Sequence, residues 1–128
     1  METNERMELV VRTAAKLSPE DRPERNAKAR LMDLTVVAEV AVGCKVDGTR
    51  RASSVMIRRF CAWRMRQEGF IPTDIARAMG VNHAAVYYYI RQMETCFELP
   101  VYYHRDIEMY TKFIEELEAH EQVREPQD

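Results

Sequence analysis

Apolar residues recur at the spacing of α-helices along nearly the whole chain. The first amphipathic stretch runs from Met7 to Leu17, and Pro23 then interrupts the pattern. The same periodicity predicts further helices at residues 24–42, 53–68, 72–79, 82–96 and 104–122. We therefore expect an all-α fold of five to six helices, with no strands between them.

The 128 residues suffice for one domain with a modest core. We expect an N-terminal helical extension at residues 1–30, a main domain at 31–122 and a disordered tail at 123–128. The apolar helix faces supply the expected core, which includes Leu31, Leu34, Val37, Ala38, Ala41, Ile57, Phe60, Cys61, Trp63, Met65, Tyr89, Ile107, Tyr110, Ile114 and Leu117.

Several residues mark where helices begin and end. Gly43 and Gly80 stand at expected C-terminal ends, because glycine adopts the left-handed backbone that terminates a helix. Ser53 or Ser54 is expected to cap the helix that follows the loop at 45–51. Asn82 is expected to cap the next-to-last helix by accepting a hydrogen bond from a free N–H group.

Residues 71–93 have the pattern of a helix-turn-helix. Ile75 and Val86 are apolar positions through which two short helices can pack at a steep angle. Ala76 is small enough for a close approach, and Gly80 opens the turn. The dominant use of this motif is to place its second helix in the major groove of DNA, although an ordinary helical hairpin shares much of the pattern.

Charge is distributed unevenly along the chain. Residues 49–93 contain eight arginines and only two acidic residues, Glu68 and Asp74, which gives this segment a net charge of +6. The remaining residues carry −8, since the whole chain carries −2. A basic segment centred on a helix-turn-helix is typical of a surface that binds duplex DNA.

Other functional classes lack support in the sequence. No apolar run is long enough to span a membrane, and the N-terminus lacks the layout of a signal peptide. Cys44, Cys61 and Cys96 are odd in number and are expected to be reduced thiols of a cytoplasmic protein. His104 and His120 have no partner at metal-ligand spacing. We therefore expect no metal, no cofactor and no enzymatic activity.

Four stretches resemble the C-terminal DNA-binding domain of the bacterial replication initiator DnaA, which shares the Trp-repressor-like helix-turn-helix group. They are Val36–Glu39, Arg58–Trp63, Thr73–Gly80 and Val81–Val86. The last of these lies where the family signature is Arg-Asp-His-Thr-Thr-Val. The resemblance covers about residues 31–117 and implies sequence-specific binding to a short box in duplex DNA. The chain has no Walker-type phosphate loop, so an ATP switch is not implied.

The resemblance and the charge pattern together give a set of expected DNA contacts. A basic loop would enter the minor groove, Arg58 matches a phosphate contact of the family, and the helix after Asn82 would enter the major groove. Ala84 and Ala85 replace two threonines of the signature, which suits contact with thymine methyl groups and suggests a different target site. The expected contact residues are Arg50, Arg51, Arg58, Thr73, Asn82, His83, Ala84, Ala85, Tyr87, Tyr88 and Arg91.

Three functions remain open at this point. The first is a DnaA-like protein that acts in replication initiation or its regulation by binding duplex DNA. The second is a dimeric transcriptional regulator of the Trp-repressor type. The third is a protein-interaction module that kept the fold and lost base recognition. The helix at 7–17 and the acidic helix at 104–122 are the candidate surfaces for a homodimer or a protein partner.

Overall fold

The computed structural model describes residues 26–47 and 51–124, and the expected helix at 7–17 lies outside this part of the chain. The described residues form helices and no strands, which confirms the all-α class. The helices are α2 (Ala27–Val42), α3 (Ala52–Gln67), α4 (Pro72–Met79), α5 (His83–Glu98) and α6 (His104–Arg124). No helix within these ranges is both long and apolar enough to cross a bilayer.

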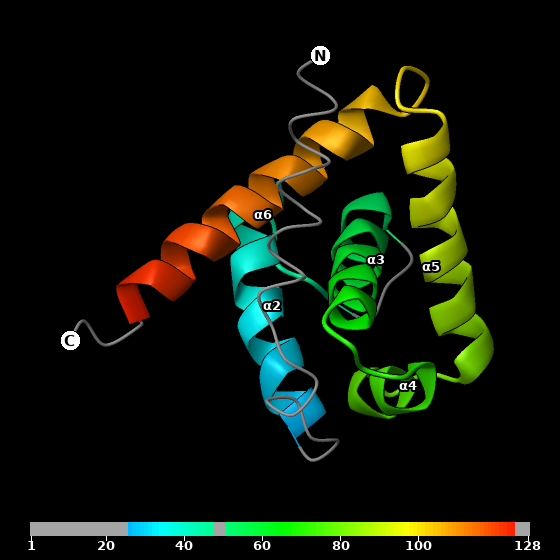
Figure 1. The fold of residues 1–128 in the computed structure, drawn as a ribbon, viewed down its shortest axis with the longest axis vertical. Helices are drawn as coiled ribbons and strands as arrows, with labels where there is room; N and C mark the ends of the chain where they lie inside the picture. Colours follow the sequence, from blue (N-terminus) through cyan, green and yellow to red (C-terminus); the bar gives the residue numbers. More distant parts are fainter. Residues whose placement is uncertain (1–25, 48–50, 125–128) are drawn as a thin grey trace.

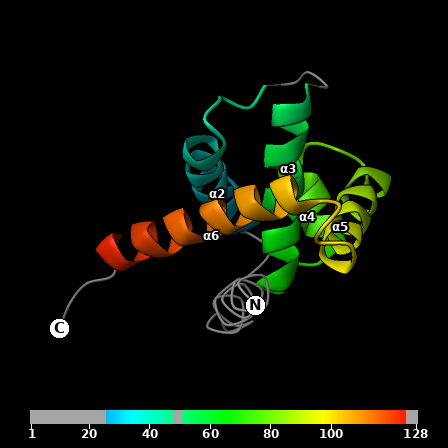
Figure 2. The same cartoon turned by 90° about the horizontal axis from the view of Figure 1, so that it is seen from above.

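Helix α3 lies at the centre of the fold, with α2 on one side and α5 on the other (Figure 1). The short helix α4 contacts α2, α3 and α5, and it lies at the end of the fold where α5 begins. Helix α6 leaves the opposite end of α5 and crosses α2, so that its last turns project beyond the other helices (Figure 2).

The core lies where the apolar faces of these helices meet around α3. The predicted stripes are confirmed: nearly all of their members are buried, and Leu31 and Trp63 are half-buried against the core. Phe70 and Phe113 complete this core, although the helical stripes did not single them out. Burial of these apolar side chains is the main contribution to the stability of the fold.

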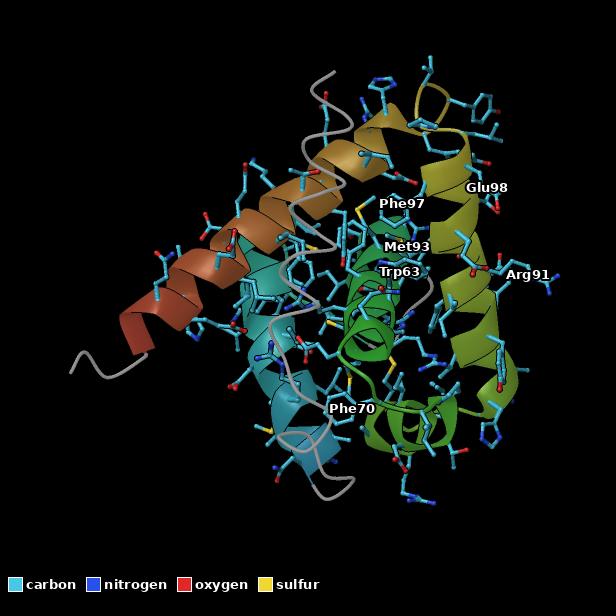
Figure 3. The ribbon with its side chains drawn as sticks, viewed as in Figure 1. Trp63, Phe70, Arg91, Met93, Phe97 and Glu98 are labelled. Carbon is cyan, nitrogen blue, oxygen red and sulfur yellow. The ribbon has the colours of Figure 1, made fainter. Side chains whose placement is uncertain are left out.

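Aromatic side chains fix the C-terminal half of α5 to the body of the protein. The ring of Phe97 lies 5.4 Å from that of Trp63 on α3 and 5.8 Å from that of Tyr110 on α6. Tyr110 in turn meets Phe60 edge to face at 5.1 Å. Met93, one turn before Phe97, is also buried (Figure 3). These contacts hold α5 at one end, while its N-terminal turns lie beside α4.

The helix ends agree with the expected signals at Gly43 and Gly80 and differ at the start of α3. Gly43 and Gly80 have φ values of 86° and 72°, so both adopt the left-handed backbone expected at a helix end. The prediction that Ser53 or Ser54 caps α3 is wrong, because Arg51 occupies the cap position without a side-chain bond. The Ser54 hydroxyl instead donates to Asp47 Oδ1 at 3.0 Å, which ties α3 to the preceding loop.

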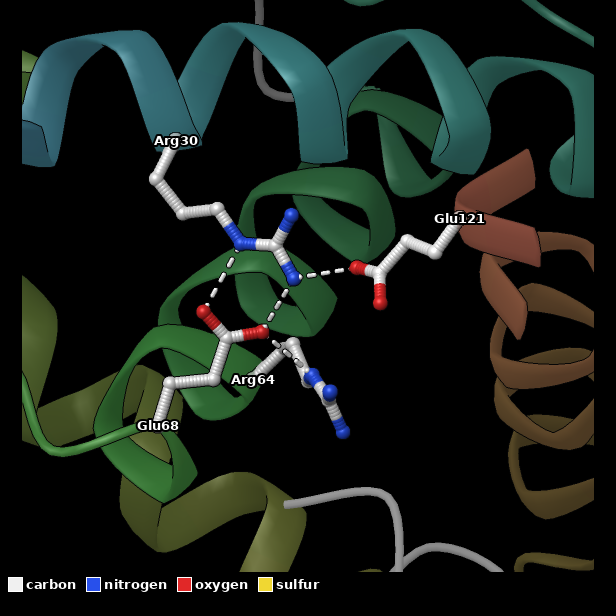
Figure 4. Close-up of polar contacts among 4 residues, drawn as sticks. All are labelled: Arg30, Arg64, Glu68 and Glu121. Carbon is white, nitrogen blue, oxygen red and sulfur yellow. Dashed lines mark hydrogen bonds and ion pairs between the residues drawn. The ribbon is translucent and has the colours of Figure 1, made fainter. Parts of the chain in front are cut away.

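A buried ionic cluster joins α2, α3 and α6 (Figure 4). Arg64 Nε donates to Glu68 Oε2 at 2.7 Å, and both side chains are completely buried. Arg30 donates from Nε and Nη2 to the two oxygens of Glu68 at 2.8 and 2.6 Å. The same Nη2 donates to Glu121 at 2.6 Å. Although burial opposes the charged form of Arg30, these two carboxylates outweigh it and raise the pKa of the guanidinium.

The bounds of α2 and α6 differ from the boundaries expected at residues 30/31 and 122/123. The expected boundary between residues 30 and 31 falls inside α2, whose first residue, Ala27, is buried in the core. At the other end, α6 continues to Arg124 and so includes the start of the expected tail. Residues 125–128 lie outside the described part of the chain.

Candidate nucleic-acid interface

Helices α4 and α5 are joined by the three residues Gly80, Val81 and Asn82. The turn is closed by backbone bonds: the N–H of Val81 donates to Ala76 O at 3.0 Å, and that of Gly80 to Arg77 O at 3.3 Å. The apolar residues expected to join the two helices, Ile75, Ala76 and Val86, are buried. Residues 72–98 thus form two packed helices connected by a tight turn that contains glycine.

Asn82 caps α5 as its sequence position predicted. Its Oδ1 accepts a hydrogen bond from the N–H of Ala85 at 3.0 Å, and its backbone is extended. The cap residue of α2, Asn26, forms no such side-chain bond. Two asparagines therefore stand at the N-terminal cap positions of helices, and of these Asn82 forms the capping bond and Asn26 does not.

Asn82→Ala is expected to lower the free energy of unfolding by about 1 kcal/mol, because a donor at the start of α5 loses its acceptor. Asn26→Ala is the matched control and should change it by less than about 0.5 kcal/mol. Urea denaturation followed by circular dichroism measures both values. Equal losses in the two variants would show that the cap at Asn82 does not stabilise α5.

The first half of α5 presents an exposed face, called here the α5 face and made up of Asn82, His83, Ala84, Tyr87, Tyr88 and Arg91. The side chains of Tyr87 and Tyr88 are each 58% exposed. Arg91 points away from the body of the protein (Figure 3). Glu94 and Glu98 continue the exposed side of the helix beyond Arg91, so its charge changes from basic to acidic along its length.

Two expected contact residues meet at the start of the helix pair. His83 Nε2 lies 2.9 Å from Thr73 Oγ1, within hydrogen-bond distance, at an exposed position. This contact connects the first turn of α4 to the first turn of α5. Ala85, in contrast, is half-buried beside the core, and its N–H is taken by Asn82. Of the two alanines expected to meet DNA, only Ala84 is exposed.

The structure divides the arginines of the basic segment into three groups. Arg64 is buried in the ionic cluster, and Arg59 pairs with Asp106 of α6 at 3.3 Å. Arg58 turns toward the protein: its Nη1 donates to Asp47 O at 2.7 Å and its Nε to the Tyr89 hydroxyl at 3.3 Å. The exposed arginines are Arg51, Arg66, Arg77 and Arg91.

The net charge of +6 counted over residues 49–93 therefore overstates the positive charge that this segment exposes at the surface. The pairing of Arg64 with Glu68 could have been expected from the sequence, because side chains four residues apart lie on the same face of a helix. The charge count could not show which of the arginines lie inside. Arg50, which we expected to enter the minor groove, lies outside the described residues. Arg51 lies at the surface directly before α3.

Cys61 and Cys96 are buried. Burial raises the pKa of the Cys61 thiol to about 12 and that of Cys96 to about 11, so both are protonated at neutral pH. Within residues 26–47 and 51–122, no three side chains of metal-ligating type gather at one place. The expected contact residues that lie on the exposed α5 face are Asn82, His83, Ala84, Tyr87, Tyr88 and Arg91.

Comparisons with known protein families, with curated proteins and with solved structures find no match for this chain.

Proposed function

We propose that this protein binds duplex DNA by inserting the first half of α5 into the major groove. The observation that carries the proposal is the α5 face itself. The aromatic contacts of Phe97 and the cap at Asn82 hold the helix at both ends, while His83, Ala84 and Tyr87 remain exposed between them. An α-helix fits the major groove, where its N-terminal residues meet base edges.

The distribution of charge supports the same orientation. Arg77 on α4 is 73% exposed although it pairs with Asp74 at 3.6 Å, and Arg91 is the exposed arginine of the α5 face itself. The acidic residues Glu115 and Glu116 lie on α6, which leaves α5 at the end opposite the α4–α5 turn (Figure 1). The arginines can therefore meet phosphates while the acidic helix stays away from the duplex, despite the negative net charge of the chain.

The resemblance to the DnaA domain extends this proposal to a biological role. We propose that the protein recognises a short duplex box and acts in replication initiation or its regulation. In this role Arg51 would approach the minor groove beside the box. Because Ala84 stands where the family has threonine, we expect a preference for thymine methyl groups at the matching position.

An interaction module that has lost base recognition is the second candidate function. Glu94 and Glu98 favour it, because they place negative charge on the exposed side of α5. A regulator of the Trp-repressor type remains the other alternative within DNA binding, and its dimeric state distinguishes it. Sedimentation equilibrium of the full chain separates a dimer from a monomer.

Fluorescence anisotropy with a labelled duplex tests the proposal. The purified chain is titrated against a random-sequence duplex pool and against a DnaA-type box at salt concentrations from about 50 to 200 mM. We expect binding that weakens steeply with salt, and a preference for the box would support the initiator-like role. No binding at the lowest salt concentration would contradict DNA binding and favour the interaction module.

Arg91→Gln is expected to weaken binding to all duplexes to a similar degree and to lower the salt slope by about 1, since one phosphate contact is lost. Within the described residues Arg91 forms no ion pair, so the substitution should leave the free energy of unfolding nearly unchanged. Lys112→Gln, at an exposed position of α6, is the control of equal charge. An equal change of slope in both variants would exclude Arg91 as a specific contact.

A further inference from the structure

The outer side of α2 is apolar over about three turns. Between positions 32 and 43, none of the exposed residues has a polar side chain: they are Met32, Val36, Val40 and Gly43. Met32, Val36 and Val40 are 62%, 57% and 64% exposed. They are spaced four residues apart and so form one continuous stripe, called here the α2 stripe. The exposed side of a surface helix is ordinarily polar or charged, so this stripe has the composition of a face that another element covers.

No described element covers the α2 stripe. Helix α2 contacts α3, α4 and α6 (Figure 1), and the residues that it buries, such as Leu34 and Val37, lie on its other side. At the C-terminal end of the stripe, Val36, Val40 and Cys44 line part of a hollow of about 350 Å³. The stripe therefore offers an apolar surface, with a depression at one end, to a segment from outside residues 26–47 and 51–124.

The chain has a segment of matching character shortly before α2. Residues 1–25 lie outside the described part of the chain, and among them one set of apolar residues recurs at helical spacing: Met7, Val10, Val11, Ala14 and Ala15. A helix over residues 7–17 would be about 15 Å long, at a rise of about 1.5 Å per residue. By the same measure the α2 stripe and Gly43 together span about 16 Å. The segment and the stripe are thus closely matched in length, and each is apolar on one face.

The connection allows the segment to return along α2. Pro19 and Pro23 lie between the two, and a proline in a helix interior breaks or kinks the helix, which disfavours one straight helix from residue 7 to residue 42. The stretch from residue 17 to residue 27 can span about 33 Å when extended, at about 3.3 Å per residue. Packed helix axes are only about 8–10 Å apart. Antiparallel packing would therefore bring residue 17 beside Met32 and residue 7 beside Gly43 without strain in the connection.

A segment of the same chain fits the α2 stripe better than a separate protein does. Stable complexes between separate proteins bury about 800 Å² on each partner. Three partly exposed side chains fall well short of that area. A segment on a short linker, in contrast, has an effective concentration on the order of mM, so a small apolar contact is enough to hold it.

We propose that residues 7–17 form an amphipathic helix that packs antiparallel on the α2 stripe of the same chain. Val10 and Val11 would contact Val36 and Val40, and the first turn of the helix would reach the hollow beside Cys44. The segment then has its partner within its own chain, in place of the homodimer considered from the sequence. This packing is independent of the proposed DNA binding.

Nuclear Overhauser spectroscopy of the methyl-labelled full chain tests the contact. We expect cross-peaks between the methyl groups of Val10 or Val11 and those of Val36 or Val40. A mixture of labelled and unlabelled copies, recorded so that only contacts between copies appear, should lack these cross-peaks. Their absence from the first spectrum, or their presence in the second, would overturn packing within one chain.

The reactivity of Cys44 gives a second measurement. Val11→Asp places a charge on the apolar face of the segment and should raise the rate of alkylation of Cys44 by iodoacetamide at least 10-fold, since the hollow is uncovered. Leu9→Asp makes the same kind of change about 200° around the predicted helix and should alter the rate by less than about twofold. Cys61 and Cys96 are buried and report on opening of the whole fold. A rise at all three cysteines, or none at Cys44, would overturn the proposal.

A substitution on the other side of the contact shows whether the two surfaces act together. Met32→Asp lies about 18 Å along α2 from Cys44 and should raise its rate of alkylation as Val11→Asp does. The double variant should react no faster than either single variant, because the segment is already released. Rates that multiply in the double variant would show that the two positions act independently and would contradict direct packing.

Discussion

Glu68→Gln is expected to lower the free energy of unfolding by about 3–5 kcal/mol. Glu68 is completely buried and is the carboxylate shared by Arg64 and Arg30. The amide cannot balance the charge of Arg64, which is itself completely buried. Since a domain of this size is stabilised by about 5–15 kcal/mol, this single change removes a large part of the total. Urea denaturation followed by circular dichroism measures the loss.

Two further variants separate this effect from general sensitivity to substitution. Glu116→Gln, at an exposed position of α6, should change the free energy of unfolding by less than about 0.5 kcal/mol. The combined replacement of Arg30, Arg64 and Glu68 by Met, Met and Leu should recover most of the stability, since it leaves no buried charge on α2 or α3. A loss below about 1 kcal/mol for Glu68→Gln would show that the cluster is not a major support of the fold.

Ala84→Glu is expected to lower the affinity for duplex DNA about 100-fold, because a carboxylate on the α5 face would oppose the phosphates and base acceptors. The same change should leave the free energy of unfolding equal or raise it by about 0.3–1 kcal/mol, because an acid in the first turn of a helix is favourable. Fluorescence anisotropy measures the first effect and urea denaturation the second. A fall in DNA affinity without a fall in the free energy of unfolding would show that a contact is lost and that the fold is intact.

The matched control is Ala29→Glu, which places an acid in the first turn of α2 at another exposed alanine. It should raise or maintain stability in the same way and leave DNA affinity unchanged within about twofold. Both substitutions change the net charge of the chain equally, so a difference between them reports on position. If the two variants lose affinity to the same degree, the α5 face is not the contact surface.

The helix pair could be predicted closely because its signals are local. Pro72 opens α4, Gly80 ends it in the left-handed region, and Asn82 caps α5 by accepting from Ala85. Apolar periodicity located the buried residues of α5, such as Val86 and Tyr89, for the same reason. These features depend on residues within a few positions of one another, which a single sequence contains.

Features that depend on distant partners could not be predicted. Arg59 pairs with Asp106, which lies 47 residues later on α6. Ser54 was expected as a possible helix cap, but its hydroxyl donates to Asp47 in the preceding loop instead. The burial of Arg64 depends on helices whose relative positions no local pattern specifies. A candidate site built from charges alone is therefore too large, because it includes arginines that form ion pairs inside the protein.

Amide NMR of the labelled protein titrated with a duplex tests the central claim most directly. The account predicts shifts concentrated at Thr73, His83, Ala84 and Tyr87, with α2 and α6 largely unaffected, and shifts that shrink as salt is raised. Shifts centred on α6 or on the exposed apolar residues of α2 (Met32, Val36 and Val40), or no shifts at low salt, would contradict it.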